Sequence, residues 1–344
     1  MGRIKDTSKL AKFEDRCFGV EIEFVAPRSL VGENSGSYQS SRSAVATAIE
    51  RVSGVTVVAE SYNHTTRTHW KIVNDSTARP TLSQHNNGYI GGFELVSPIL
   101  KGENSINELK AILKAMRLLN LDVSRHCGLH VHHDVREWRK DLRSSDFNRN
   151  HDAMNKITNC ITLTQKFEDV IYGMLPKSRK SGGWARTINS TYRSVWHSMN
   201  GKASHNKADK MKALKKYQKS HSTSASFQRD RTCGLNFHSM FRHGTVEFRY
   251  GAPTLNAEKM INWIVFTQQF VNMAEVWKSV QTPKEMLIDI KANVDLTFEK
   301  MRDTLGLTKR MCRDEFQRNC SLWIRKRFNN FHTVSDDGTV TRND

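Results

Sequence analysis

The strongest constraint on the fold is a short pattern in which polar residues alternate with apolar ones. In FGVEIEF, residues 18–24, the apolar side chains alternate with Glu21 and Glu23. Because successive side chains of a strand point to opposite faces, this run predicts a strand with one apolar face and one anionic face. Glu21 and Glu23 would then both lie on the polar face of a sheet and would not be buried in its apolar core.

Several other runs show the same alternation, and we expect strands there as well. They are THWKIVND (68–75), GFELVSP (92–98), GLHVHHD (128–134), GLNFHSM (234–240) and GTVEFRY (244–250). The last two are close enough in the chain to favour a hairpin.

Helices are expected between the strands, wherever apolar residues recur every three or four positions. The ranges are 41–52, 104–119, 151–175, 256–279, 284–303 and 309–329, and a short basic helix is expected near 206–219. Asn104 is a favourable cap for the second of them. Interspersed strands and helices predict an α+β fold, a largely antiparallel sheet with helices on its apolar face and its polar face open.

The charge distribution suggests how the 344 residues are divided. We expect a catalytic domain over 1–280 with a basic insertion at about 176–232, a helical extension packed on it over 281–330, and a flexible tail over 331–344. The insertion carries 14 Lys and Arg against two Asp, and residues 300–328 carry nine against three acids, within a net charge of +18. Such blocks attract polyanions such as nucleic acid. A solvated basic face would explain them equally well.

Composition excludes several classes of protein. No run approaches the roughly 18 apolar residues of a membrane helix, and MGRIKDTSKL at the start lacks the apolar region of a secretory signal. The six cysteines include no C-x-x-C pair, which argues against a cysteine zinc site or a disulfide framework. We expect a cytoplasmic protein without a membrane partner.

If the strands share one sheet, its polar face gathers chemically useful side chains. They are Glu21, Glu23, Glu94, His130, His132, Glu247 and Arg249. Neighbouring carboxylates raise each other's pKa unless cations neutralise them, and such a donor set suits Mg²⁺ or Mn²⁺. Arg249 cannot be a ligand, and its natural partner is a phosphate or a carboxylate. The set predicts a metal-dependent site for phosphoryl transfer.

Two other functions remain open on these residues. His130 and His132 on one strand face can chelate Zn²⁺, which fits a metal-dependent hydrolase such as a nuclease or a peptidase. The basic segments instead fit a nucleic-acid-binding protein without catalytic activity. Each motif alone is weak, because an E-x-E strand is usually a solvated sheet face.

Taken in order, five motifs resemble those of the amidoligase family, which is related to glutamine synthetase and glutamate–cysteine ligase. They are FGVEIEF, WKIVNDST (70–77), GGFELVSP (91–98), CGLHVHHDV (127–135) and HGTVEFRYGAPTLNAEKMINWI (243–264). The resemblance covers roughly 17–135 and 231–275. It implies a catalytic domain like that of glutamine synthetase. It also implies an ATP-dependent carboxylate–amine ligase that forms an amide or isopeptide bond through an acyl phosphate.

The resemblance also implies roles for the acids. Glu21, His130 and Glu247 would hold the metal that bridges the ATP phosphates. Glu23 and Glu94 would hold the metal nearer the acceptor carboxylate.

The remaining roles follow from the same resemblance. Arg249 would contact the transferring phosphate, and His132 the nucleotide. Asp75 would act in the active site, although this chain reads Asp-Ser-Thr where the family commonly has Asp-Gly-Ser or Asp-Ser-Ser. Asn236 and Arg231 would reach the nucleotide or substrate.

The basic insertion suggests an anionic acceptor. A modified nucleic acid, a peptidoglycan fragment or an acidic protein tail would fit it, with Lys212, Lys215 and Lys216 as contacts.

Overall fold

The computed structural model describes residues 9–31, 38–181, 183, 185–188, 232–277, 294–334 and 340–343. The expected helix at 206–219, most of the basic insertion, and residues 284–293 lie outside this part of the chain. The predicted boundary near residue 280 therefore stays a prediction. None of the described helices is long and apolar enough to cross a membrane.

An α+β fold is confirmed, with a seven-stranded and largely antiparallel sheet. The strand order is β2-β3-β4-β1-β5-β7-β6. Strands β1 and β4, β3 and β4, and β6 and β7 pair antiparallel, whereas β2 and β3 are parallel. The chain divides into an N-terminal unit, residues 14–132 and 251–264, and a C-terminal unit, residues 1–13, 133–250 and 265–344.

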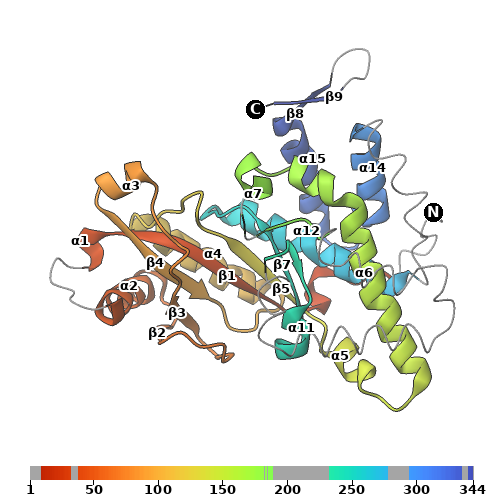
Figure 1. Ribbon diagram of the computed structural model, residues 1–344, viewed down its shortest axis with the longest axis horizontal. Helices are drawn as coiled ribbons and strands as arrows, with labels where there is room; N and C mark the ends of the chain where they lie inside the picture. The colour runs from red at the N-terminus through yellow and green to blue at the C-terminus, as the bar shows by residue number, and fades with distance from the viewer. Residues whose placement is uncertain are drawn as a thin grey trace. The chain divides into compact units, whose positions relative to one another are not determined.

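The N-terminal unit contains most of the strands (Figure 1). Its elements are β1 (Phe18–Pro27), α1 (Arg28–Val31), α2 (Tyr38–Ser53), β2 (Val57–Ala59), β3 (Trp70–Asn74), α3 (Leu82–Asn86), β4 (Tyr89–Val96), α4 (Gly102–Leu118) and the first residues of β5 (Leu129–Asp134). The strands expected at 18–24, 68–75, 92–98 and 128–134 are confirmed, as are the helices at 41–52 and 104–119.

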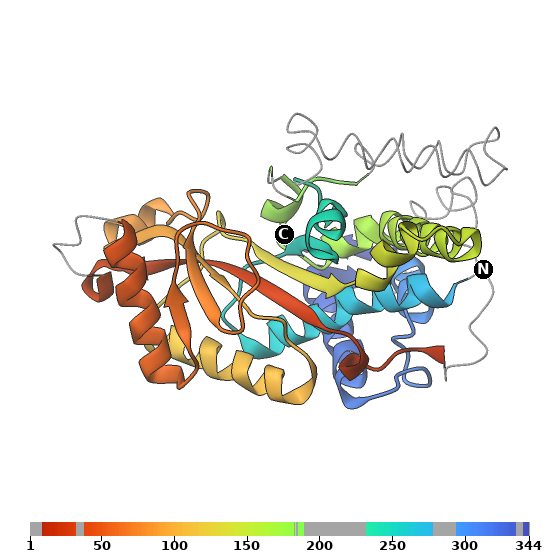
Figure 2. The ribbon, with the colours of Figure 1, turned by 90° about the horizontal axis from the view of Figure 1, so that it is seen from below.

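Alternation along the strands places the apolar side chains of this unit on one face. Ile22 pairs with Leu95 and Leu95 with Ile72, and all three are fully buried. Trp70 shares this face, and its indole N–H donates to Glu108 of α4. Figure 2 shows α4 below the strands of this unit. The helix therefore covers the apolar face, as expected.

The predicted cap of α4 is wrong. The helix begins at Gly102, two residues before Asn104, and its N-cap is Lys101. Gly102 adopts a φ of 68°, a conformation that glycine reaches without steric cost, and this turns the chain into the helix earlier than the pattern suggests. The backbone N–H of the N-cap residue Lys101 donates a hydrogen bond to the Ser105 hydroxyl, and this fixes the first turn of the helix.

The C-terminal unit is mainly helical. Its elements are α5 (Arg136–Leu142), α6 (Phe147–Gly173), α7 (Lys177–Ser181), β6 (Leu235–Asn236), α11 (His238–His243), β7 (Thr245–Gly251), α14 (Val294–Thr304), α15 (Glu315–Phe331), β8 (His332–Val334) and β9 (Val340–Arg342); α12 (Ala257–Val276) runs through both units. The helices expected at 151–175, 256–279 and 309–329 are confirmed.

The predicted strand at 234–240 is wrong beyond Asn236, although β6 and β7 do pair. The Asn236 side chain accepts a hydrogen bond from the His238 amide and so starts α11 in place of a simple turn. The helix ends at Gly244, whose φ of 77° suits a glycine cap. The residues between the two strands are thus a short helix.

Residues 331–344, expected as a tail, contain β8 and β9, which pair antiparallel. The His332 ring stacks on Phe328 with centroids 4.3 Å apart. Arg342 donates to the Leu175 carbonyl at 2.8 Å. These contacts tie the end of the chain to the C-terminal unit, and the polar composition of the segment gave no sign of them.

A buried carboxyl lies in the C-terminal unit at Glu168 of α6. It accepts hydrogen bonds from the Tyr250 hydroxyl at 2.6 Å and from the Ile188 amide at 2.9 Å. Burial raises the pKa of Glu168 to about 7, against the effect of these two hydrogen bonds.

This pKa predicts a pH-dependent stability. Between pH 4.5 and 7 the folded protein keeps a proton on Glu168 that the unfolded chain has lost, so stability falls as the pH rises through that window. Relative to Glu168→Gln, the wild type should lose about 3 kcal/mol of unfolding free energy across it. Urea unfolding at a series of pH values measures this. Glu137→Gln, on an exposed residue of α5 whose charge does not act on Glu168, should keep the wild-type dependence. An identical pH dependence in wild type and Glu168→Gln would contradict the prediction.

Candidate metal centre

Two carboxylates face each other on neighbouring strands of the N-terminal unit. Glu23 of β1 and Glu94 of β4 are register partners, and their side chains share one face of the sheet. They are only 5% and 7% exposed. The polar face is therefore not open at its centre, in contrast to the expectation. Like charges so close and so buried require compensation.

His130 of β5 completes this group. Glu23, Glu94 and His130 offer ligand atoms that all lie within 4.8 Å of one another, and His130 is only 3% exposed. Two carboxylate oxygens and an imidazole nitrogen match the donors that Mg²⁺, Mn²⁺ and related divalent ions accept. The structure thus brings the sequence-predicted residues Glu23, Glu94 and His130 together as a group that could hold a metal ion.

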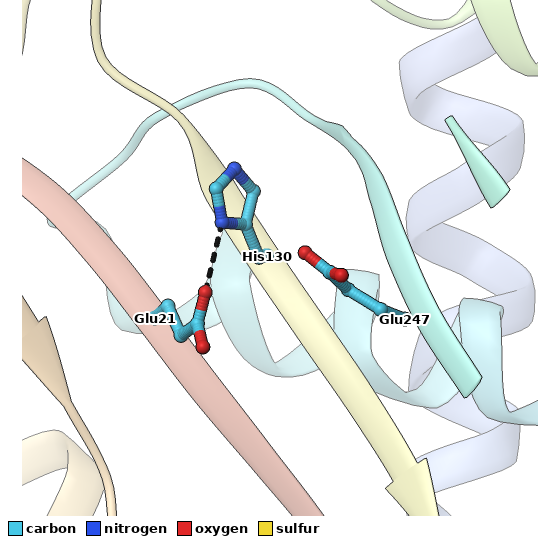
Figure 3. A group of neighbouring side chains, drawn as sticks. All are labelled: Glu21, His130 and Glu247. Carbon is cyan, nitrogen blue, oxygen red and sulfur yellow. Dashed lines mark hydrogen bonds and ion pairs between the residues drawn. The ribbon is translucent and has the colours of Figure 1, made fainter. Parts of the chain in front are cut away.

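The His130 ring faces a carboxylate on each side. Its Nδ1 lies 3.1 Å from Glu21, and its Nε2 lies 3.5 Å from Glu23. Figure 3 shows the contact with Glu21, together with the Glu247 side chain of β7. A neutral imidazole has one N–H and can donate to only one of these carboxylates. The other carboxylate therefore needs another partner, and for Glu23 the Gly128 amide is one.

Glu21 is more accessible than the other acids, with a side chain that is 27% exposed. Its second oxygen lies 3.3 Å from Nε2 of His132. Burial raises the pKa of Glu21, but the charge of His132 and hydrogen bonds from both histidines outweigh it, and the net pKa lies well below the usual value. Glu21 is therefore held as a carboxylate at the rim of the group.

Gly128 has no side chain, and this leaves room for the His130 and Glu23 side chains. Its amide donates to Glu23 at 2.7 Å. A Cβ at this position would lie 2.7 Å from Nε2 of His130 and 3.1 Å from the Glu23 carboxylate. Only glycine fits without moving the two side chains.

Lys71 of β3 is a residue of this face that we did not anticipate. It pairs with Val96, which pairs with Glu21, so all three lie on the same face. Its ammonium group donates to the Asn63 side chain and to the Thr65 carbonyl, each at 2.8 Å. Burial lowers the pKa of Lys71, whereas Glu60, Glu21 and Glu94 raise it in part. The alternation in WKIVND already separates Lys71 from its apolar neighbours.

The predicted residues of the C-terminal unit form a buried network among themselves. Glu247 accepts hydrogen bonds from the Asn236 amide group at 2.6 Å and from the Arg249 guanidinium at 2.5 Å. All three are less than 10% exposed. The E-x-R motif is therefore a buried ion pair and not a solvated one. Arg231 lies outside the described residues, as do Lys212, Lys215 and Lys216.

Asp75 follows β3 in the N-terminal unit. Its carboxylate accepts hydrogen bonds from the Thr77 amide at 2.7 Å and from the Thr77 hydroxyl at 2.6 Å. These contacts fold the turn that follows the strand.

The geometry predicts that Gly128→Ala weakens metal binding without unfolding the protein. The new methyl group would displace His130 and Glu23, so we expect Mn²⁺ affinity to fall at least about tenfold. Titration calorimetry with Mn²⁺ measures this. Gly19→Ala is the control, because its nearest contacts lie at 3.5 Å or more. Equal affinity in both variants would contradict the account of Gly128.

Comparison with known proteins places the chain in a family. A family model described as "Putative amidoligase enzyme" matches residues 14–271. Among solved structures, a bifunctional glutathione synthetase from Pasteurella multocida is similar, with 11% sequence identity and a TM-score of 0.31. The match covers 92% of this chain but only 52% of the synthetase chain, so this chain spans about half the length of that protein. No curated protein gave a significant match. Because the family model matches most of the sequence, this chain belongs to the amidoligase family.

Proposed function

We propose that the protein is an ATP-dependent carboxylate–amine ligase that forms an amide or isopeptide bond with the help of Mg²⁺ or Mn²⁺. Membership of the amidoligase family supports ligase activity. The observation that carries the proposal is the buried group of Glu23, Glu94 and His130.

Electrostatics favours a divalent cation in this group. Each buried carboxylate loses its hydration, and their mutual repulsion adds to that cost. A hydrogen bond from the Gly128 amide compensates Glu23 in part. A divalent ion would neutralise both carboxylates at once and keep coordination positions for phosphate oxygens.

The proposed reaction has two steps. An oxygen of the acid substrate attacks the γ-phosphorus of ATP, the bond from phosphorus to the bridging oxygen breaks, and ADP leaves. The amine nitrogen then attacks the acyl carbon, the carbon–oxygen bond to phosphate breaks, and the amine loses a proton. The divalent ion supplies charge neutralisation for the phosphates in the first step.

We propose roles for the side chains on the two units. Glu23 and Glu94 hold the ion nearer the acid substrate. Glu21 and His130, which lie on one unit, would hold the ion that neutralises the ATP phosphates. The assignment of Glu247 to the same ion stays a prediction.

Other side chains would bind the reactants. Arg249 holds the transferring phosphate, because a guanidinium offers two parallel donors. His132 and Asn236 act on the nucleotide side, and Asp75 on the amine side. The assignment of Arg231 to the nucleotide stays a prediction.

The test is a product assay with paired variants. Wild-type protein with ATP, Mg²⁺ and pooled carboxylates and amines should yield ADP and an amide by mass spectrometry. Glu94→Gln and Glu23→Gln should each lower kcat at least about a hundredfold, since each removes a charge that holds the metal. Glu103→Gln, on the exposed start of α4, should retain activity.

Other outcomes would favour the rival functions. Hydrolysis of a peptide or nucleic acid without ATP, lost in His130→Gln, would indicate the metal-dependent hydrolase. Salt-sensitive nucleic-acid binding that is unchanged in Glu94→Gln, with no amide formed, would indicate a binding protein.

A further inference from the structure

One end of the polar face in the N-terminal unit is closed by two segments, residues 75–79 and 122–128, which we name the end wall. Val25 of β1 is fully buried there against Ala78 and Cys127. The Ser124 hydroxyl donates to the Arg79 carbonyl at 2.6 Å and so joins the two segments. The end wall is therefore a built feature with fixed backbone contacts.

Three basic side chains gather on the end wall. Arg79 and Arg125 are exposed, and His126 is half-buried. Nε of Arg125 lies 3.5 Å from Nε2 of His126. Burial lowers the pKa of His126, and the positive charges of Arg79 and Arg125 lower it further. The Arg125 guanidinium thus faces the His126 imidazole, and the charges of both arginines oppose protonation of that ring.

This positive charge lacks an acidic partner within the part of the chain that the structure describes. No ion pair there includes Arg79 or Arg125. The end wall has two acids of its own. Asp75 accepts hydrogen bonds from the Thr77 amide and hydroxyl, and Asp122 accepts them from the Gln84 side chain and the Val123 amide. Uncompensated neighbouring cations favour the binding of an anion.

The end wall lies next to the candidate metal centre. The Gly128 amide contacts Glu23, and His126 precedes Gly128 by two residues, at most about 7 Å of extended chain. Carboxylates that suit metal ions and arginines that suit an oxyanion are therefore neighbours on one unit.

We propose that Arg79 and Arg125, with His126, bind a carboxylate of the acid substrate other than the one that reacts. The inference rests on the proposed ligase function and narrows its substrate to acids with a second carboxylate. In the proposed function, divalent ions at the acidic group would neutralise the phosphates of ATP. The end wall instead offers planar guanidinium groups, which bind a carboxylate through paired hydrogen bonds.

The experiment measures binding without turnover. Glutarate and, separately, ATP are titrated into the full chain with Mg²⁺ at constant ionic strength, and calorimetry gives each Kd. Arg79→Gln/Arg125→Gln should weaken glutarate binding at least about tenfold and leave ATP binding unchanged. The matched control is Arg51→Gln/Arg117→Gln, which removes the same charge from exposed sites on α2 and α4 and should bind glutarate like the wild type.

Each contrary result is informative. Absence of saturable glutarate binding by the wild type, or equal affinity in all three proteins, overturns the proposal. Loss of ATP affinity with unchanged glutarate affinity assigns the end wall to nucleotide phosphate and also overturns it. If the arginines are required for glutarate binding but no amide forms in the product assay, the binding site stands and the ligase assignment fails. Thermal unfolding of each variant confirms that the fold is retained.

Discussion

The repulsion between Glu23 and Glu94 is the constraint on which the candidate site depends. The two carboxylates are register partners on adjacent strands and almost fully buried, with the His130 imidazole beside them. A sheet that places two acids in this way gives up stability unless a cation binds there. Gly128 is consistent with a cation site here, because it leaves room for the His130 and Glu23 side chains. Its backbone N–H also donates a hydrogen bond to Glu23.

Alternation along the strands made much of this predictable from the sequence. The pattern at Glu21 and Glu23 fixed which side chains share a face, and the same reasoning placed Glu94 and His130. What alternation cannot reveal is burial, because a polar face looks the same whether it is open to water or covered. The expectation of an open face failed at Glu23 and Glu94 for this reason. Local hydrogen bonds were also hidden, as the helix started by the Asn236 side chain and the early start of α4 at Gly102 show.

The positions of the basic side chains near the acidic group were the hardest to predict from sequence periodicity. Lys71 followed the polar phase of its strand, but its buried contacts with Asn63 and Thr65 depend on a loop of irregular structure. Arg79 lies in an irregular segment and Arg125 in a turn, where no periodicity exists to place them. Their proximity follows from the hydrogen bond between Ser124 and the Arg79 carbonyl. The acids lie on strands and the arginines lie outside them, so strand periodicity alone could not predict that both belong to one region of the unit.

The most direct test of the account is crystallographic. Crystals grown with Mn²⁺ and examined at a wavelength near the manganese absorption edge should show an anomalous peak within coordination distance of Glu23, Glu94 and His130. The peak should disappear in Glu94→Gln crystals of the same form. A wild-type map with no peak at these three side chains under saturating Mn²⁺, or a peak that persists in the variant, would contradict the central claim that the opposed carboxylates exist to bind a metal ion.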